Sequence, residues 1–274
     1  MRTPAIRTRS SLPPTASGQA AAAAFEVLIE IDTDGHRSGV KPEQEDLLHI
    51  AHALHEGGMR LAGVLTHAGS SYRVDTAEQL SAVAEQERAG CVLAAKRLRA
   101  ANFPCAEVSI GSTPTALSAQ HLDGVTEVRA GVYVFFDLVM SNVGVCTADE
   151  IALSVLTTVT GHQSDRGWAI VDAGWMAMSQ DRGTQTQKQD YGYGQVCSVD
   201  GIAIPGYVLT AANQEHGVLA RQAGIDPNIA RRFPIDMQLR ILPNHACATA
   251  AQFSEYCVLD ENGSLATWGR SKGW

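Results

Sequence analysis

The feature that most constrains this fold is a regular alternation of apolar strand-like runs and helical runs between residues 25 and 137. Apolar residues recur at helical spacing between Glu43 and Gly57, and a longer helix is predicted from Thr76 to Ala101. The strand-like runs around these helices are 25–32, 60–69, 106–111 and 125–137, of which the last is a strand together with its loop. Repeated strand–helix units with polar residues after each strand predict a parallel sheet like that of a TIM barrel.

The pattern changes after about Cys146, where helical periodicity disappears and Gly, Pro, Asp and Asn separate short apolar runs. Short runs bounded by turn residues are typical of β structure, so this half is predicted to be a compact β domain. Its strand-like runs are 151–162, 167–174, 193–201, 205–220 and 238–246.

Two domains are therefore expected, and the fold class is α/β plus β. Residues 25–146 are predicted to form a partial TIM-barrel (β/α) domain, and residues 147–274 a C-terminal β domain. A complete barrel has eight βα units in about 250 residues. Only four such units are predicted here, so we expect the barrel to lack its first strands.

Residues 1–24 differ from the rest of the chain, because they contain three Arg and three Pro but no acidic residue. This composition resembles a transit peptide. However, Pro13 and Pro14 would break an amphipathic helix. We therefore expect a disordered tail, or a spurious segment from a misplaced start of translation.

Charge and composition argue against several functional classes. The net charge of -8 and the lack of any Lys/Arg-rich stretch argue against a nucleic-acid partner. The longest apolar runs, such as 132–136, are far too short to span a bilayer, so no membrane partner is expected. The six cysteines have no framework spacing, which is typical of reduced thiols in a cytoplasmic protein.

A histidine and a cysteine two residues apart, His245 and Cys247, form a candidate zinc site near the C-terminus. On an extended strand, residues i and i+2 point to the same side, so one ion would reach both side chains. Imidazole and thiolate are both good zinc ligands. The alternative is a buried cysteine beside a hydrogen-bonded histidine at a strand end.

A second candidate site is the sequence SIGSTPTA, in which a predicted strand runs into Gly111, Ser112 and Thr113. We expect Thr113 to cap a helix that has Pro114 at its first position. The free N–H groups of such a helix start, together with two hydroxyls, predict a phosphate-binding loop. The alternative is an ordinary capped helix.

Polar clusters also follow the other predicted strands of the barrel domain. Each single residue is more often a structural turn residue than a catalytic group. Since active sites of such barrels collect at the carboxyl ends of the strands, the clusters together predict a polar site for an anionic ligand. Their members are Asp32, His36, Arg37, His67, Tyr72, Arg129 and Tyr133.

These motifs, in this order, resemble the D-serine dehydratase and D-threonine aldolase family of alanine-racemase-like (fold type III) pyridoxal phosphate enzymes. The resemblance covers residues 25–274. The motifs that carry it are EIDTDGHRSGV, LTHAGSSY, VSIGSTPTA, EVRAGVYVFFD, DAG, DYGYG, ANQEHG, LRILPNHACATA and the closing GW.

The resemblance implies two cofactors, pyridoxal 5'-phosphate and zinc, and a small D-amino acid as substrate. It assigns zinc to His245 and Cys247, and this cysteine favours the dehydratase branch, because the aldolase branch tends to place an aspartate there. It also implies a homodimer. The residues that it assigns to cofactor binding are Tyr72, Gly111, Ser112, Thr113, Arg129, Gly131, Val132 and Tyr133.

In such a dehydratase, the cofactor stabilises the carbanion formed when the substrate Cα loses its proton, and zinc makes the β-hydroxyl a better leaving group. The products are a keto acid and ammonia. A lysine that holds the cofactor normally removes the Cα proton.

Two positions depart from the family pattern. The cofactor lysine of the family lies on the first barrel strand, and none of Lys41, Lys96, Lys188 and Lys272 matches it. No catalytic residue is therefore predicted, and the chain is expected to be inactive by itself. Val132 stands where the family is expected to carry a polar residue.

Three functions remain open at this point. The first is a dehydratase-type lyase represented by a truncated reading frame. The second is a non-catalytic remnant that binds a metal or a partner. The third is a lyase of the D-threonine aldolase type.

Overall fold

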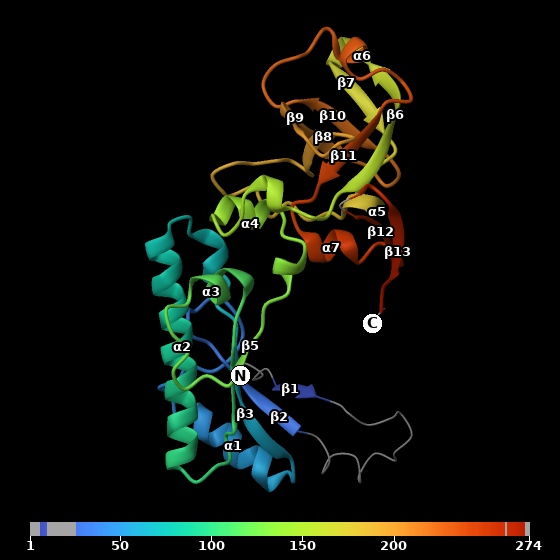
Figure 1. The fold of residues 1–274 in the computed structure, drawn as a ribbon. Coiled ribbons are helices and arrows are strands. Elements are labelled where there is room, and N and C mark those ends of the chain that lie inside the picture. Colours follow the sequence, from blue (N-terminus) through green and yellow to red (C-terminus); the bar gives the residue numbers. More distant parts are fainter. Residues whose placement is uncertain (1–5, 10–25, 261, 272–274) are drawn as a thin grey trace. The chain divides into compact units, whose positions relative to one another are not determined.

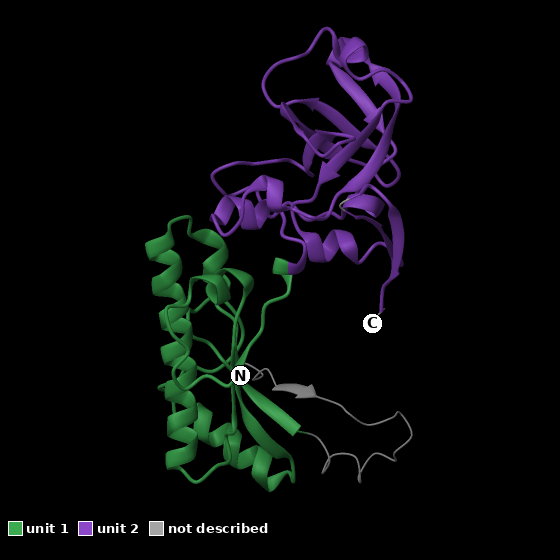
Figure 2. Cartoon of the chain, in the orientation of Figure 1, with its two compact units in different colours: residues 1–133 green, residues 134–274 purple. Residues whose placement is uncertain are grey.

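The computed structural model describes residues 6–9, 26–260 and 262–271 (Figure 1). The chain divides into two compact units, residues 1–133 and 134–274 (Figure 2). The sequence pattern changes near residue 146, whereas the boundary between the two units lies between residues 133 and 134. Residues 134–146 therefore belong to the second unit. No helix within the described ranges is long and apolar enough to cross a membrane.

The first unit contains a five-stranded sheet in the order β1-β2-β3-β4-β5. Strands β2 to β5 are parallel, as the sequence predicts, whereas β1 pairs antiparallel with β2. Apart from β1, the segment 1–24 for which we expected disorder lies outside the described residues. The strands are β1 (Ile6–Arg9), β2 (Glu26–Ile31), β3 (Arg60–Thr66), β4 (Glu107–Ile110) and β5 (Glu127–Val128).

The fourth predicted strand and its loop, 125–137, consist mostly of loop. Only Glu127–Val128 pair with β4, and the remainder of 125–137 contains the 3-10 helix η3 (Val132–Val134).

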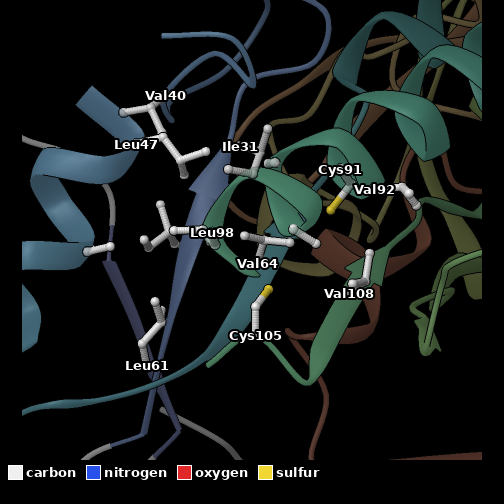
Figure 3. Close-up of a cluster of buried hydrophobic side chains, with 14 of the residues drawn as sticks. Ile31, Val40, Leu47, Leu61, Val64, Cys91, Val92, Leu98, Cys105 and Val108 are labelled. Atoms are coloured by element: carbon white, nitrogen blue, oxygen red, sulfur yellow. The ribbon is translucent and has the colours of Figure 1, made fainter. Parts of the chain in front are cut away.

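Helices of the first unit pack against its sheet, and their apolar residues form the core together with those of the strands. They are α1 (Asp46–Glu56), α2 (Ala77–Ala100) and α3 (Thr113–Ser118), with the 3-10 helix η2 (Gly69–Arg73) before α2. Leu47 of α1 and Leu98 of α2 pack with Ile31, Val64 and other strand residues in a fully apolar cluster (Figure 3). Thr76 caps α2, since its hydroxyl accepts a hydrogen bond from the Gln79 N–H. This core fixes the strand ends that carry the candidate site.

The second unit is built on a closed antiparallel barrel in the order β10-β7-β6-β11-β8-β9, which confirms the predicted β domain. Phe233 and Ile241 are fully buried in its core. The predicted run 205–220 is a hairpin of two strands. The barrel strands are β6 (Val155–Gln163), β7 (Trp168–Val171), β8 (Gln195–Ser198), β9 (Ala203–Ala212), β10 (Gly217–Arg221) and β11 (Gln238–Leu242).

Short helices and one hairpin complete the second unit. The helices are α4 (Leu138–Val143), η4 (Ala148–Glu150), η5 (Ser164–Arg166), α5 (Trp175–Met178), α6 (Ile229–Arg232) and α7 (Ala246–Ala250). The hairpin consists of β12 (Glu255–Leu259) and β13 (Leu265–Gly269). The N–H groups of Leu138 and Val139 donate to the carbonyls of Pro243 and Asn244, so the start of α4 pairs with the loop that follows β11.

Candidate functional site

Gly111 brings the carboxyl ends of β4 and β5 into close contact. It has φ +129, and a Cβ added there would lie 2.4 Å from the carbonyl oxygen of Arg129. The Arg129 N–H donates to the Ile110 carbonyl at 2.8 Å. Glycine is therefore required both by the backbone conformation and by the approach of the neighbouring chain.

The loop after Gly111 is capped by Ser112, and our prediction that Thr113 is the cap was wrong by one residue. The Ser112 hydroxyl accepts a hydrogen bond from the Thr115 N–H at 3.3 Å, and the Thr115 hydroxyl accepts one from the Ser112 N–H at 3.0 Å. Pro114 consequently occupies the second helical position, where its missing N–H also has no partner to lose. Sequence alone does not separate these two registers, since Ser and Thr are both good caps.

The remaining hydroxyl groups of this loop join it to its neighbours. The Ser112 hydroxyl lies 3.2 Å from that of Ser71, which belongs to the loop after β3. The Thr113 hydroxyl accepts a hydrogen bond from the Tyr133 N–H at 3.2 Å. Loops that follow three different strands therefore meet at this edge of the sheet.

His67 supplies a neutral imidazole at the same edge. Its Nδ1 lies 3.0 Å from the Gly111 carbonyl oxygen, and its ring stacks on Tyr72 with centroids 5.8 Å apart. Burial, together with the nearby charges of Arg37 and Arg129, lowers the pKa of His67 to about 4. At neutral pH this histidine therefore carries no charge.

The residues after β5 differ in exposure. Arg129 is half-buried and donates to the Ser109 hydroxyl and to the Thr66 carbonyl. Tyr133 is exposed, as is Gly131, and Val132 is half-buried. Arg129 thus brings a fixed positive charge to the strand ends, where Gly131 and Tyr133 face solvent.

Glu87 on α2 is a member of this site that our sequence analysis missed. Its side chain is fully buried, and its Oε1 accepts hydrogen bonds from the N–H groups of Ala68 at 2.8 Å and Gly111 at 3.3 Å. Burial raises the pKa of this carboxyl group. A signal was present, because Glu87 lies on the helix face that also contains the buried Ala84 and Cys91.

This arrangement fits an anionic group such as a phosphate. Arg37 and Arg129 lie near the neutral His67. Gly111 has no side chain, so the backbone of this loop stays accessible to a ligand. The hydroxyl oxygens of Ser112 and Thr113 each accept a hydrogen bond from a backbone N–H within the protein, and a hydroxyl that accepts can still donate its own hydrogen to an anion. Of the other predicted polar residues, Asp32 accepts a hydrogen bond from the Gly35 N–H at 2.7 Å and stabilises its own turn.

The second candidate site lies between β11 and α7. His245 is the residue before α7 and Cys247 lies in its first turn, so our prediction that both lie on a strand was wrong. The two side chains nevertheless approach each other, since the Cys247 thiol is within hydrogen-bond distance of His245 and contributes to its raised pKa. Cys247 is exposed, in contrast to the alternative of a buried structural cysteine.

Asp181 completes this cluster and carries no signal in the sequence. Its Oδ2 accepts a hydrogen bond from the His245 Nδ1 at 2.7 Å. This contact raises the pKa of His245 and lowers that of Asp181. Asp137, which is buried, accepts a hydrogen bond from the Ala246 N–H at 2.8 Å and so fixes the residue between His245 and Cys247.

The donors of this cluster suit zinc, because imidazole and thiolate are its usual nitrogen and sulfur ligands. Among the described residues, no group of three or more His, Cys, Asp and Glu side chains is arranged to hold a metal ion. A metal bound by His245 and Cys247 would therefore retain open positions, as catalytic zinc does and structural zinc does not.

Comparisons with known proteins cover almost the whole chain. The family model described as "Putative serine dehydratase domain" matches residues 152–259, and "Alanine racemase, N-terminal domain" matches residues 11–139. D-threo-3-hydroxyaspartate dehydratase from Delftia sp. (strain HT23) is 67% identical over 94% of this chain and 69% of its own length. The chain belongs to the D-serine dehydratase and D-threonine aldolase family. The resemblance stated from the motifs is thereby confirmed.

Other members of the D-serine dehydratase and D-threonine aldolase family agree with this assignment. D-serine dehydratase from Dictyostelium discoideum is 29% identical, and the alignment covers 91% of this chain and 65% of that enzyme. A structure of the Delftia dehydratase superposes with a TM-score of 0.87 at 66% identity, over 93% of this chain and 70% of that one. An alanine-racemase-like protein from Idiomarina loihiensis gives 0.82 at 47% identity, over 90% and 65%. The fold is therefore alanine-racemase-like.

Two further similar structures, with 66% and 65% sequence identity to this chain, are mutants of a D-threo-3-hydroxyaspartate dehydratase. One replaces a cysteine by alanine and is in a metal-free form. The other replaces the histidine two positions before that cysteine.

Proposed function

We propose that this chain is a dehydratase-type lyase component that binds pyridoxal phosphate and zinc and recognises a D-3-hydroxy amino acid. The observation that carries the proposal is the pair His245 and Cys247 beside Asp181, in a chain 67% identical to a D-threo-3-hydroxyaspartate dehydratase. A homodimer is the assembly that we expect from the family.

His245 and Cys247 would hold the zinc ion. The spacing of histidine and cysteine in the two D-threo-3-hydroxyaspartate dehydratase mutants is the same as here, and the cysteine mutant is in a metal-free form. When bound, zinc supplies a Lewis acid that makes a hydroxyl group a better leaving group. In this proposal the chain supplies one nitrogen ligand and one sulfur ligand and leaves the other coordination positions of the zinc ion open.

Pyridoxal phosphate would bind at the carboxyl ends of β3, β4 and β5. When bound, it supplies an electron sink for a carbanion at Cα. Arg129 and the backbone around Gly111 provide charge and space for the phosphate, and His67 stays neutral in the same region. The proposed cofactor-binding residues are Tyr72, Gly111, Ser112, Thr113, Arg129, Gly131, Val132 and Tyr133.

Dehydration is favoured over aldol cleavage. The D-threonine aldolase of Arthrobacter sp. is only 28% identical to this chain, against 67% for the Delftia dehydratase. D-threo-3-hydroxyaspartate is therefore the first substrate to test, followed by D-serine and D-threonine.

The lysines of this chain bear on the proposed function. Lys41, Lys96 and Lys188 are exposed, and Lys272 lies outside the described residues. We propose that none of them forms the imine with the cofactor, so that this chain binds its ligands without turnover unless an amine is supplied.

A crossed binding experiment tests the two halves of the proposal separately. Equilibrium dialysis of the wild type is expected to show binding of both pyridoxal phosphate and zinc. Arg129→Gln should weaken pyridoxal phosphate binding about tenfold or more and leave zinc unchanged, because it removes one charged hydrogen-bond donor. Cys247→Ser should do the reverse. Failure of the wild type to bind either ligand would contradict the proposal.

Product analysis tests the reaction type. A small primary amine is added with pyridoxal phosphate and zinc, to act as the base in place of a cofactor lysine. The proposal predicts an amine-dependent keto acid from D-threo-3-hydroxyaspartate. Glycine and an aldehyde from D-threonine would instead indicate an aldolase.

A further inference from the structure

The contact between Asp181 and His245 determines which ring nitrogen can bind a metal. The Asp181 Oδ2 lies 2.7 Å from Nδ1 of His245, and both side chains are partly exposed, at 33% and 39%. A carboxylate only accepts, so the proton of a neutral imidazole is held on Nδ1. Nε2 is then unprotonated and free to coordinate.

Asn244, the residue before His245, fixes Asp181 in turn. Its amide nitrogen donates to the backbone carbonyls of Asp181 at 3.1 Å and Gly192 at 2.7 Å, and its oxygen accepts from the Thr184 hydroxyl at 3.1 Å. Asn244 is only 2% exposed. All of its side-chain contacts therefore connect the loop of His245 with the segment that carries Asp181.

The hydrogen bonds around Asp181 and His245 tie two segments of the chain together, whereas an ordinary exposed ion pair contributes little to stability. A histidine that binds a metal, in contrast, commonly donates its other N–H to a carboxylate, which fixes the tautomer and the ring orientation. The geometry at His245 has this form before any metal is bound.

We infer that Asp181 is a positioning residue that presents Nε2 of His245 to the metal, and that Asn244 holds the Asp181 segment in register with the His245 loop. The inference rests on the proposed zinc site. It adds a residue that touches neither the metal nor the substrate, and it specifies Nε2 as the coordinating atom.

Zinc affinity, measured by competition with a chromophoric chelator, is the test. Asp181→Ala in the full chain is expected to weaken zinc binding about 10- to 100-fold, which is the usual effect of losing such a partner. Asp181→Asn should lose less zinc affinity, because its amide oxygen still accepts a hydrogen bond from Nδ1 of His245. Asp165→Ala, which changes an exposed aspartate of the same unit, is the matched control and should bind zinc as the wild type does.

Cobalt substitution provides a second readout that a purely structural role would not change. In Asp181→Ala the cobalt–thiolate band of Cys247 should persist, while the ligand-field bands change because His245 is no longer held. Melting temperatures identify any variant that does not fold, in which case Asp181→Asn carries the test. Equal zinc affinity and equal cobalt spectra in the wild type and Asp181→Ala would overturn the inference. A wild type without zinc would instead overturn the proposed function.

Discussion

At the scale of single residues, Gly111 sets the spacing between the ends of β4 and β5. A side chain there would collide with the backbone of Arg129, which has no freedom to move because its N–H is bound to Ile110. The loop that follows Gly111 is the proposed phosphate site, so its position depends on this one residue.

Gly111→Ala should lower the free energy of unfolding by about 2–4 kcal/mol, since it combines a positive φ with a backbone collision. Gly58→Ala is the matched control, because Gly58 also has a positive φ but nothing lies within 4 Å of its added Cβ. The free energy of unfolding of Gly58→Ala should be lower than that of the wild type by only about 1 kcal/mol. Urea denaturation measures both, and equal losses would refute the close contact.

His67 should make stability depend on pH between 6.5 and about 4. Its pKa is lowered by folding, so below pH 6.5 the unfolded chain takes up a proton that the folded chain does not. Stability is therefore lost as pH falls through this window, by at most about 3 kcal/mol.

In His67→Gln this loss should be smaller, and unfolding free energies across the same pH range measure it. His49→Gln, which changes a histidine with a 75% exposed side chain, serves as the control and should follow the wild type. Parallel profiles for the wild type and His67→Gln would show that His67 titrates normally.

At the scale of elements, α2 does more than cover the sheet. Glu87 reaches from its buried face to the loops after β3 and β4 and holds the N–H groups of Ala68 and Gly111. Buried N–H groups that lack a partner are costly, so these two hydrogen bonds restrict both loops. We therefore regard Glu87 as the part of α2 that fixes both loops of the proposed cofactor site.

Glu87→Gln retains an accepting oxygen and should unfold within about 1 kcal/mol of the wild type. Glu87→Leu leaves two buried N–H groups without a partner and should lose about 2–5 kcal/mol. Hydrogen exchange at Ala68 and Gly111 locates the effect, with faster exchange expected only in Glu87→Leu. Unchanged exchange there would show that other contacts hold these loops.

Hydrophobic periodicity was sufficient to predict the helices and strands that have regular apolar faces. It did not predict the elements that lack such a face. α1, α2 and β2 to β4 were placed within a few residues because their apolar faces are regular. Of the strand and loop predicted for 125–137, only Glu127–Val128 form a strand, which pairs with β4.

For the candidate metal site, too, the sequence predicted some residues and missed others. His245 and Cys247 were found by residue type, although the helix that carries Cys247 was not. Asp181 was not found, because its role depends on a contact with His245, 64 positions away. No local pattern reports such a contact.

At the scale of the whole molecule, the proposed role of the lysines follows from the family resemblance. The chain is 67% identical to the Delftia dehydratase over 94% of its length, and we propose that none of its four lysines is the cofactor lysine. Treatment with pyridoxal phosphate and borohydride should therefore leave no reduced adduct on any lysine. Mass spectrometry of the peptides checks this, and a specific adduct at one lysine would contradict the proposal that the chain forms no imine.

The zinc content of the purified chain tests the central claim most directly. Elemental analysis should find one zinc ion per chain in the wild type and in His67→Gln, whose substitution lies in the other unit. His245→Ala and Cys247→Ser should contain none, because each removes one of two protein ligands. Equal zinc in all four proteins, or none in the wild type, would contradict the assignment of this chain as a zinc-binding member of a dehydratase.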